Sequence, residues 1–595
     1  MQNLILKFLG TNWTSVQFSP VPKGQPGDLA MSFFNLSEES LKNIQKDISK
    51  PKIHKETGED INKIIRGSQK NIDIKARVQY FQHLLRKCPF IEKTEIAGPY
   101  LNLFFKNEAF FKEVFQTPLQ TKLLKDKNII IEFSGPNTNK PLHLGHMRNH
   151  ALGISMSNLL EAVGAKVHRV NIINDRGVHI CKSMLAYQKW GNGETPESTS
   201  EKSDHFVGRY YVKFETESKK DESLKDEIQK MLVKWEEGDA EVQNLWKKMN
   251  DWALAGHAQT YERQGISFEK IYTESDTYLM GKDIAQEGLK KKVFQRRDDG
   301  AIVIDLESEK LGEKVILRAD GTSIYLTQDL AVASLRNEDF QPDEMIYVVA
   351  DEQNYHFQVL FACLEQLNIL KRNQLCHLAY GLVNLPHGRM KSREGTVVDA
   401  DNLMDELSQL ALQEIKKRNP EIPEKEAKIT AERIMNAAWK FYLLQTSPRK
   451  TMMFDPEASL AFEGATGPYL QYAGVRIKSI LKKAGLPREI ILPEAELPLR
   501  GISQGEKPLG VKILQFPEVL NRAAEMKNPT YLVTYLLELA QEWSSFYAEN
   551  SVLNADTEDL KQSRLALAQK VLDVLEQGLK VLGIEIPEMM GGRSR

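Results

Sequence analysis

Short β-branched runs alternate with long helical patterns near the first third of the chain. Residues Ile129–Phe133 are mostly apolar and end in a Ser-Gly-Pro-Asn loop, after which a helical pattern continues to Gly164. Lys166–Ile173 then resumes a strand. A strand, a loop, a helix and a second strand in this order predict a βαβ unit of a parallel sheet. Ligands bind such sheets at the carboxyl ends of the strands, so the loop after the first strand is the first candidate site.

Further strand candidates follow later in the chain. The turn Arg296–Gly300 before AIVIDL predicts a hairpin, and Asp320-Gly321 marks a turn in VILRADGTSIYL, where we expect the sheet to resume. Glu344–Ala350 predicts a buried parallel strand, followed by a helix over Gln353–Leu367. Leu375–Leu385 predicts one more strand. Strands that alternate with helices in this way indicate an α/β fold.

Changes in pattern divide the rest of the chain. An alternating strand at Ile96–Phe105 and charged helical patterns before it indicate a mixed N-terminal unit, while helical periodicity dominates beyond about residue 400. A charged helical stretch interrupts the sheet region and opens with GNGETPESTSEKSD, a polar linker that we expect to be flexible. The predicted parts are an α+β domain at 1–110, a Rossmann-type doubly wound parallel-sheet domain at 111–400 with an insertion at about 185–300, a helical linker at 401–445 and an α-helical bundle at 446–595.

Composition narrows the class of protein. The 595 residues carry a net charge of −2, so any RNA contact must come from local basic faces. Four widely spaced cysteines, none in a CxxC pair, favour a reducing compartment and argue against structural zinc. The apolar runs are shorter than a membrane span, and Met1–Gly10 is a poor secretion signal. We therefore expect a cytoplasmic protein with no structural metal, no membrane and no DNA partner.

Two histidines flank a glycine where the long predicted helix begins, in PLHLGH. The first turn of a helix presents unpaired N–H groups and the positive end of the dipole, which together favour an anion. We expect His143 and His146 to donate hydrogen bonds to phosphate, and Gly145 to let a nucleotide lie against bare backbone. A surface pair or half of a zinc site is the alternative, although no glutamate stands between the histidines as in HExxH.

A glycine-bounded basic loop, GRMKSREGTVV, follows the last predicted strand. Its cations Arg389, Lys391 and Arg393 suit a reaction in which negative charge builds on a leaving pyrophosphate. A solvated surface turn is the alternative for a loop of this composition. Its pairing with HLGH on the same predicted sheet favours the catalytic interpretation.

This pair of motifs resembles the HIGH and KMSKS signatures of class I aminoacyl-tRNA synthetases. The surrounding residues resemble the arginyl-tRNA synthetase family, and the resemblance runs nearly end to end through EFSGPNTNKPLHLGHMRN, LRADGTSIYLTQDLA, VVADEQNYHF, RMKSREGTVV and FEGATGPYLQYAGVRI. It implies activation of L-arginine with ATP and Mg²⁺ to arginyl-adenylate, release of pyrophosphate, and transfer of arginine to the 3′ end of tRNA-Arg. It also implies a monomer that needs no covalent enzyme intermediate.

The resemblance assigns roles in ATP binding. His143, Gly145 and His146 would hold the nucleotide, His356 would lie near the adenine or ribose, and the basic loop would contribute Met390, Lys391 and Ser392.

The basic loop departs from the family pattern. Ser392 stands where the second lysine of KMSKS belongs, and Lys140 precedes HLGH in the place of a lysine thought to substitute for it. We hypothesise that Lys140 supplies the cation for the pentavalent phosphate and that Lys391 is secondary. An exposed loop lysine is the alternative for Lys140. Arg176 is a second departure, because many bacterial members carry tryptophan there.

Arginine recognition requires carboxylates and neutral acceptors for a planar fork of five donors. The resemblance places Tyr325, Asp329 and Gln353 around the substrate side chain, and Glu132 and Asn137 near its amino and carboxylate end. Tyr325 and Asp329 are four residues apart, so they share a helix face if the helix has begun there. Asp329 as a helix N-cap and Glu132 as an ion-pair partner remain alternatives.

In the C-terminal helix LQYAGVRIKSILKK an aromatic residue is followed by cations on one face. This pattern fits base stacking with phosphate contact, or equally a solvated basic face. The resemblance favours tRNA contact through Tyr469, Gln471, Tyr472 and Arg476, and contact of the N-terminal domain with the outer corner of the tRNA. The competing functions are a different class I adenylating ligase and an inactive synthetase paralogue that binds RNA.

Overall fold

The computed structural model describes residues 17–19, 29–32, 74–98, 100–385, 398–485 and 504–590 of the chain. The chain forms two compact units. Unit 1 comprises Met1–Leu119, Arg476–Glu518 and Glu538–Leu575, and unit 2 comprises Gln120–Val475, Val519–Leu537 and Glu576–Arg595.

Unit 1 contains an antiparallel sheet in the order β1-β2-β4-β3. The predicted single strand over Ile96–Phe105 is wrong, because the chain turns at Gly98, whose φ of +59° lies in the left-handed region. Ala97 and Tyr100 therefore pair across the end of a hairpin. The elements of this part are β1 Gln17–Ser19, β2 Leu29–Ser32, α5 Ile74–Leu85, β3 Ile91–Ala97, β4 Tyr100–Phe105 and α6 Asn107–Gln116.

Unit 2 is built on a five-stranded sheet in the order β12-β11-β5-β6-β7, and each strand runs parallel to its neighbours. The order reverses between β5 and β11, which creates a switch point at their carboxyl ends. The strands are β5 Asn128–Glu132, β6 Lys166–Ile173, β7 Lys270–Thr273, β11 Glu344–Ala350 and β12 Leu375–Tyr380. The predicted α/β class and the strands at Lys166–Ile173 and Glu344–Ala350 are confirmed.

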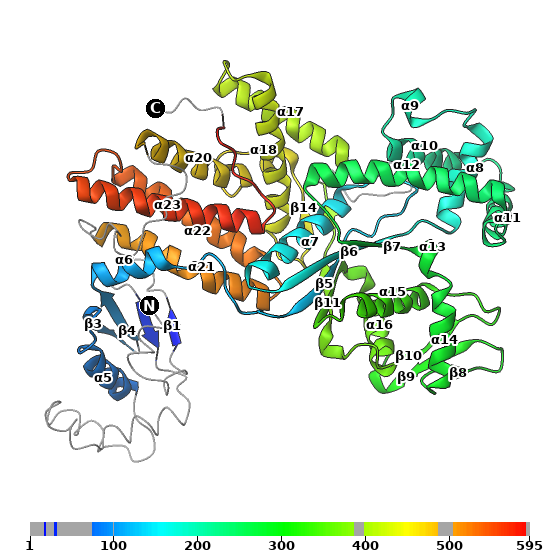
Figure 1. The fold of residues 1–595 in the computed structure, drawn as a ribbon, viewed down its shortest axis with the longest axis horizontal. Coiled ribbons are helices and arrows are strands. Elements are labelled where there is room, and N and C mark those ends of the chain that lie inside the picture. The colour runs from blue at the N-terminus through cyan, green and yellow to red at the C-terminus, as the bar shows by residue number, and fades with distance from the viewer. Residues whose placement is uncertain are drawn as a thin grey trace, which may run out of the picture. The chain divides into compact units, whose positions relative to one another are not determined.

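Helices cover both faces of this sheet (Figure 1): α7 lies on one side, and α15 with α16 on the other. The core against α15 and α16 joins buried strand residues such as Ile130 and Met345 to Leu330 and Leu360. The covering elements are α7 Leu144–Ala162, α15 Tyr325–Phe340, η3 Asp351–Gln353, α16 Asn354–Gln366 and η4 Arg372–Gln374.

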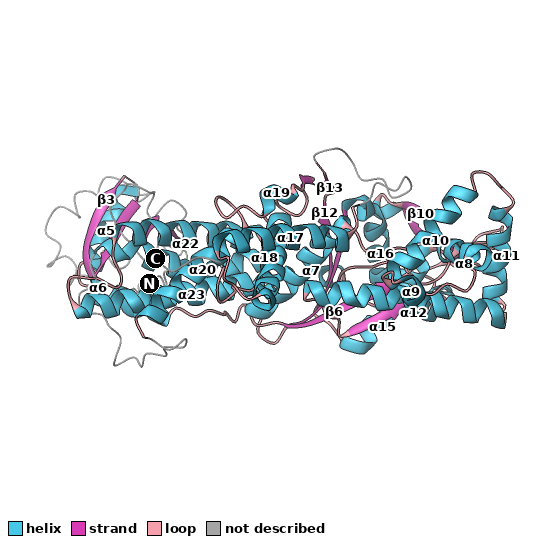
Figure 2. Cartoon of the chain, turned by 90° about the horizontal axis from the view of Figure 1, so that it is seen from above, coloured by secondary structure: helices cyan, strands magenta, loops and turns pink. Residues whose placement is uncertain are grey.

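The stretch from α8 to α12 is almost entirely helical (Figure 2) and has its own aromatic core, which includes Phe206 and Trp235. The expected flexible linker is instead ordered: Thr195 and Ser198 cap a short helix reciprocally, and the Tyr187 hydroxyl donates to the Glu194 carbonyl at 2.7 Å. The helices are α8 Val178–Trp190, α9 Pro196–Thr199, α10 Ser203–Glu217, α11 Leu224–Glu236, α12 Ala240–Gln264, α13 Glu274–Thr277 and α14 Met280–Lys290.

A second sheet in this unit is antiparallel, in the order β10-β9-β8. The hairpin predicted at Arg296–Gly300 is confirmed. The main sheet does not resume at VILRADGTSIYL as expected, because this strand pairs with β9 instead. The elements are β8 Gln295–Arg296, β9 Ile302–Leu306, η2 Glu307–Glu309 and β10 Gly312–Leu317.

Helices dominate the C-terminal third, as predicted. They are α17 Ala400–Arg418, α18 Glu424–Leu444, α19 Pro456–Ser459, α20 Gly467–Lys483, η7 Gln504–Glu506, α21 Lys507–Glu525, α22 Thr530–Glu549 and α23 Glu558–Val581. Two short strands, β13 Val383–Asn384 and β14 Met452–Met453, pair in parallel. Among the described helices, none has an apolar stretch long enough to cross a membrane.

Gly153 determines how closely α7 approaches the sheet, because a Cβ there would lie 2.2 Å from Cγ of Phe133. We expect Gly153→Ala to lower the free energy of unfolding by about 1–3 kcal/mol, since overpacking outweighs the gain of roughly 1 kcal/mol in helix propensity. Denaturant unfolding measures this change. Glu161→Ala on the exposed end of the same helix removes a surface ion pair with Arg169 and should cost less than about 1 kcal/mol. A Gly153→Ala variant as stable as the wild type would contradict this packing.

Candidate active site

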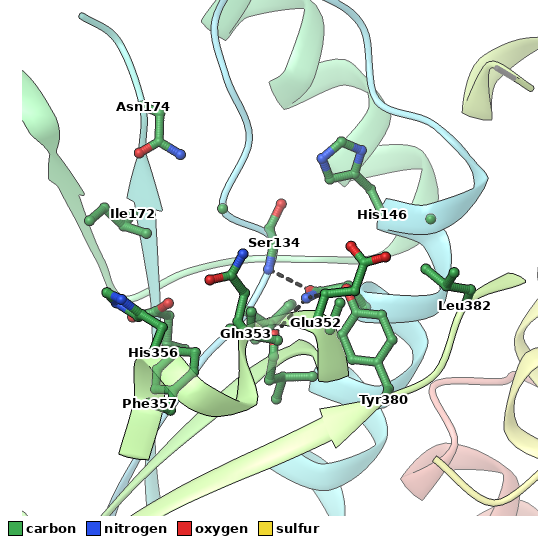
Figure 3. A pocket seen from close by; sticks show the side chains of 18 of the residues that line it. Ser134, His146, Ile172, Asn174, Glu352, Gln353, His356, Phe357, Tyr380 and Leu382 are labelled. Carbon is green, nitrogen blue, oxygen red and sulfur yellow. Dashed lines mark hydrogen bonds between the residues drawn. The ribbon is translucent and has the colours of Figure 1, made fainter. Parts of the chain in front are cut away.

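A cavity of about 720 Å³ opens at the carboxyl edge of the parallel sheet, where the strand order reverses. In Figure 3, Ser134 and His146 from the β5–α7 side point into the same space as Glu352, Gln353 and His356 from the β11–α16 side. A cavity of this size suits a nucleotide or another small molecule. The predicted site residues that line it are Glu132, Lys140, His143, Gly145, His146, Tyr325, Asp329, Gln353 and His356.

The two histidines of HLGH cap their own helix. His143 is the N-cap of α7, and its Nδ1 accepts the amide hydrogen of Gly145 at 3.1 Å. Nδ1 of His146 accepts the amide hydrogen of His143 at 3.2 Å, which completes a capping box. A neutral imidazole whose Nδ1 accepts carries its proton on Nε2. Both rings are thereby fixed as Nε2–H donors.

Burial keeps these rings neutral. It lowers the pKa of His143 to about 3, with further contributions from Lys140 and His150, and it lowers the pKa of His146 well below its ordinary value. Burial also lowers the pKa of the Lys140 ammonium. This side of the cavity therefore presents neutral donors next to one lysine, a combination that suits a polyphosphate.

Gly145 is required by the capping geometry. A Cβ at this position would lie 2.9 Å from Cε1 of His143 and would displace the ring.

In the described part of the chain, the group with metal-ligand spacing is Asp204, His205 and Asp401 rather than the HLGH histidines. The Lys202 ammonium already lies 2.9 Å from Asp204 and 2.8 Å from Asp401, so a lysine supplies the cation there.

The opposite side of the cavity is acidic. Because α15 begins at Tyr325, Asp329 lies one turn further along the same face, and both residues line the cavity. Asp329 is not an N-cap: its carboxylate lies 2.5 Å from Nε2 of His356. The hydrogen bond with Asp329 raises the pKa of His356. Tyr325 is 74% exposed and forms part of the rim.

The sequence left Glu132 as either a site residue or an ion-pair partner, and in the structure it is placed to be both. It lines the cavity, and its carboxylate also pairs with the guanidinium of Arg336, which is fully buried in α15. Burial raises the pKa of Glu132, and the Arg336 charge opposes this effect. Removing one partner of such a pair would leave a buried charge without compensation.

Glu274 is an acidic residue that the sequence reasoning missed. It begins α13 directly after β7, is buried, and lies within electrostatic range of Asp329. Burial raises the pKa of Glu274 to about 7, and the Arg176 charge partly offsets the increase.

Arg176, the residue that departs from the tryptophan of many bacterial members, packs against aromatic side chains. Its guanidinium lies over the rings of Tyr278 and Trp235.

Other predicted residues lie elsewhere. Asn137 is not among the residues that line the cavity, although its backbone forms a bridge with Asn174, which does. Met390, Lys391 and Ser392 lie outside the described residues.

The predicted tRNA-contacting residues of α20 differ in exposure. Tyr472 and Arg476 are exposed, and the Arg476 guanidinium lies 4.5 Å from the centroid of the Tyr547 ring. Gln471 is fully buried, and its amide donates to the carbonyls of Arg433 and Glu585 at 3.0 and 2.6 Å. Direct RNA contact by Gln471 is therefore a wrong prediction, because the side chain is used inside the protein.

Comparison with known proteins agrees with this geometry. Residues 112–455 match the family model described as "tRNA synthetases class I (R), catalytic domain", and residues 470–590 match "DALR anticodon binding domain". The arginine–tRNA ligase of Treponema denticola is 47% identical over 504 residues, covering 83% of this chain and 85% of the relative. That of Parabacteroides distasonis is 46% identical over 541 residues, covering 86% and 89%. The solved arginyl-tRNA synthetase of Thermus thermophilus is 25% identical, with a TM-score of 0.79 and 99% of each chain covered.

The parallel sheet, the histidine-capped helix at its switch point and the catalytic-domain match define a class I aminoacyl-tRNA synthetase. Within that class, the chain belongs to the arginyl-tRNA synthetase family. The resemblance stated from the sequence is thereby confirmed.

Proposed function

We propose that this chain is an arginine–tRNA ligase, which activates L-arginine with ATP and transfers the arginyl group to the 3′ end of tRNA-Arg. The observation that supports this most directly is the division of one cavity into a side of neutral donors with Lys140 and a side of carboxylates. ATP is an anion and the arginine side chain is a cation, so each substrate has a complementary side. Identities of 43–47% to arginine–tRNA ligases argue against a ligase for another amino acid.

In the first step the carboxylate of arginine attacks the α-phosphorus of ATP, and the bond to pyrophosphate breaks. His143 and His146 donate through Nε2–H to the phosphates, and the Lys140 ammonium stabilises charge on the pentavalent phosphorus. Positioning and charge stabilisation are sufficient, so no covalent intermediate with the protein is needed. ATP is expected as its Mg²⁺ complex, in which the ion neutralises part of the phosphate charge.

We assign the arginine side chain to the acidic side of the cavity. Asp329 lines the cavity and is the carboxylate assigned to the guanidinium fork, with Tyr325 and Gln353 around it. Glu274 is not among the lining residues, but it lies within electrostatic range of Asp329, and we assign it as the second acid on this side. Glu132 is assigned to the amino group of the substrate, with Asn137 near its carboxylate end. His356 binds Asp329, and its predicted place near the adenine or ribose stays a prediction.

In the second step a ribose hydroxyl at the 3′ end of tRNA-Arg attacks the arginyl carbonyl, and AMP leaves. We propose that the helical domain at 446–595 binds the anticodon stem through Tyr469, Tyr472 and Arg476. The N-terminal domain at 1–110 would contact the outer corner of the tRNA. We expect the enzyme to act as a monomer in the cytoplasm.

ATP–pyrophosphate exchange with each amino acid, with and without tRNA-Arg, tests the function directly. We expect exchange with arginine alone among the amino acids, because a buried acid left without its cation rejects uncharged analogues such as citrulline. Exchange that appears only after tRNA is added would show that tRNA completes the site. A chain that supports no exchange under either condition would be an inactive paralogue.

Lys140 is expected to contribute more to adenylate formation than Lys391. Lys140→Ala should lower the exchange rate by about 100-fold or more, since it removes a preorganised charge beside the reacting phosphate. Lys391→Ala is the matched comparison and should have a smaller effect. If Lys140→Ala kept near-normal exchange while Lys391→Ala abolished it, the two roles would be reversed.

The ionisation of Glu274 predicts a pH dependence for arginine binding. The buried carboxyl has a pKa of about 7, and the substrate guanidinium binds its charged form. Below that pH a proton must be released on binding, so the KM for arginine should rise about tenfold per pH unit as pH falls. Glu274→Gln should raise this KM above pH 8 and flatten its pH profile. The KM for ATP, measured in parallel, is the control, and a variant with the wild-type profile would exclude Glu274 from the site.

A further inference from the structure

A buried lysine lies in α18 and, among the described residues, has no carboxylate within ion-pair distance, although the charge of Glu585 acts on it. Lys440 is 4% exposed, and its ammonium donates to the carbonyls of Gln264 and Gly583 at 2.8 and 2.7 Å. Burial lowers its pKa to about 8. A cation is costly to bury, so a lysine held in this way indicates a position where its contacts matter.

Both carbonyls lie where a helix ends. Helix α12 ends at Gln264 and is followed by Gly265 with φ +70°, and α23 ends at Val581 shortly before Gly583 with φ +72°. The left-handed glycine at each end stops the helix, so the carbonyls at that end have no further helical N–H to bond. The negative ends of two helix dipoles thus meet at one ammonium, which compensates for its burial.

One face of α12 fixes the loop that leads into the active site. Nε2 of His257 lies 3.0 Å from the carbonyl of Lys140, and the Tyr261 hydroxyl lies 2.7 Å from Oγ of Ser134. Gln264, at the end of the same face, lies 2.7 Å from Nδ1 of His150. The backbone carbonyl of Gln264 itself accepts the hydrogen bond from Lys440.

The hydrogen bonds from Gln264 to the cavity have a defined direction. Oε1 of Gln264 can only accept, so Nδ1–H of His150 donates to it, and Nε2 of His150 accepts from Oγ–H of Ser134 at 2.8 Å. Ser134 lines the cavity with a φ of +83°, a conformation that a residue other than glycine adopts only when its surroundings hold it. The register of α12 therefore determines whether this turn is kept.

The other end of the lysine contact belongs to the C-terminal segment. Gly583 falls within residues 470–590, which match the anticodon-binding family model. The same turn is also held from α7, where Nδ2 of Asn158 donates to the carbonyls of Lys580 and Val581 at 3.0 and 3.3 Å. Of these two attachments, the one through Lys440 also contacts α12.

We propose that Lys440 is a positioning residue for the arginylation reaction, which holds α12 in the register that fixes Lys140 and Ser134 and links the C-terminal turn to the reacting centre. This inference rests on the proposed function, because its readout is arginine-dependent catalysis. Lys440 is not among the residues that line the cavity, so it acts through Gln264 and its neighbours.

Lys440→Met keeps the length of the side chain and removes the ammonium. We expect a fall of about 10-fold to 100-fold in the kcat of arginyl transfer to tRNA, with the KM values for arginine and ATP within about threefold of the wild type, because the reacting groups are misplaced and the substrates still bind. Asn158→Ala is the matched control, since it loosens the same C-terminal turn without touching α12, and its kcat should stay within about twofold.

A double-mutant cycle separates positioning from general loss of structure. Gln264→Met removes the bond to His150 and leaves the backbone carbonyl for Lys440, so it should lower kcat alone, and Lys440→Met should add little in its background. Independent, multiplying effects, or a wild-type kcat in Lys440→Met, would overturn the proposal.

Thermal unfolding of each variant shows that the assay temperature lies below the transition. If Lys440→Met does not fold, Gln264→Met carries the test, and an unchanged kcat in that variant overturns the proposal. A wild-type chain without arginine-dependent activity would instead overturn the proposed function, and the inference with it.

Discussion

The reciprocal capping of α7 by His143 and His146 is the interaction on which the active site depends. Each Nδ1 satisfies a backbone N–H that would otherwise lack a partner at the start of the helix, so each ring is fixed in orientation and tautomer at once. A serine and a glutamate would cap the helix equally well, but they would present no second donor to the cavity. Burial then keeps the rings neutral, and Gly145 leaves the first ring its space.

The support for this cap comes from buried cations bound to backbone carbonyls. Arg148 in α7 is fully buried and donates to the carbonyls of Leu382, Pro448 and Lys450 at 3.2, 2.9 and 2.8 Å, and Lys440 holds two helix ends in the same manner. A carbonyl carries only a partial charge, so several correctly placed carbonyls are needed to compensate for the burial of one cation. Replacing it with an apolar side chain would fill the space and lose the spatial arrangement of the segments.

The parts that the sequence predicts well are those whose burial leaves a pattern. Glu344–Ala350 is a strand whose apolar run is nearly continuous, as expected when both faces are covered, so its limits are sharp. Lys166–Ile173 contains polar residues as well, but its valines and isoleucines lie between the end of one helix pattern and the start of the next. Strand β7 has only four residues and is defined by its pairing with β6, so no local sequence pattern predicts it. Glu274 follows this strand directly, and an acid whose strand is not predicted cannot be assigned to the edge of the sheet.

Side-chain burial within a helix is equally hard to predict. In α20 a helical wheel places Gln471 next to an exposed tyrosine, and only the carbonyls of Arg433 and Glu585, distant in sequence, show that its amide faces inward. The linker before α10 differs from its prediction for the opposite reason. Its composition is that of a flexible segment, but Thr195 and Ser198 cap a helix and Tyr187 binds the chain beside it. A polar sequence is ordered when its hydrogen bonds close locally.

The acids in and near the cavity differ in how their charge is compensated. Glu132 pairs with the buried Arg336, the partly exposed Asp329 binds His356, and burial raises the pKa of Glu274 to about 7. Only the last two can change their compensation easily, since a proton is lost or a histidine released at little cost, whereas Arg336 is fully buried. Under the proposed assignment, Asp329 and Glu274 would therefore be the acids available to the substrate guanidinium, and Glu132 would remain the fixed charge against which the substrate is oriented.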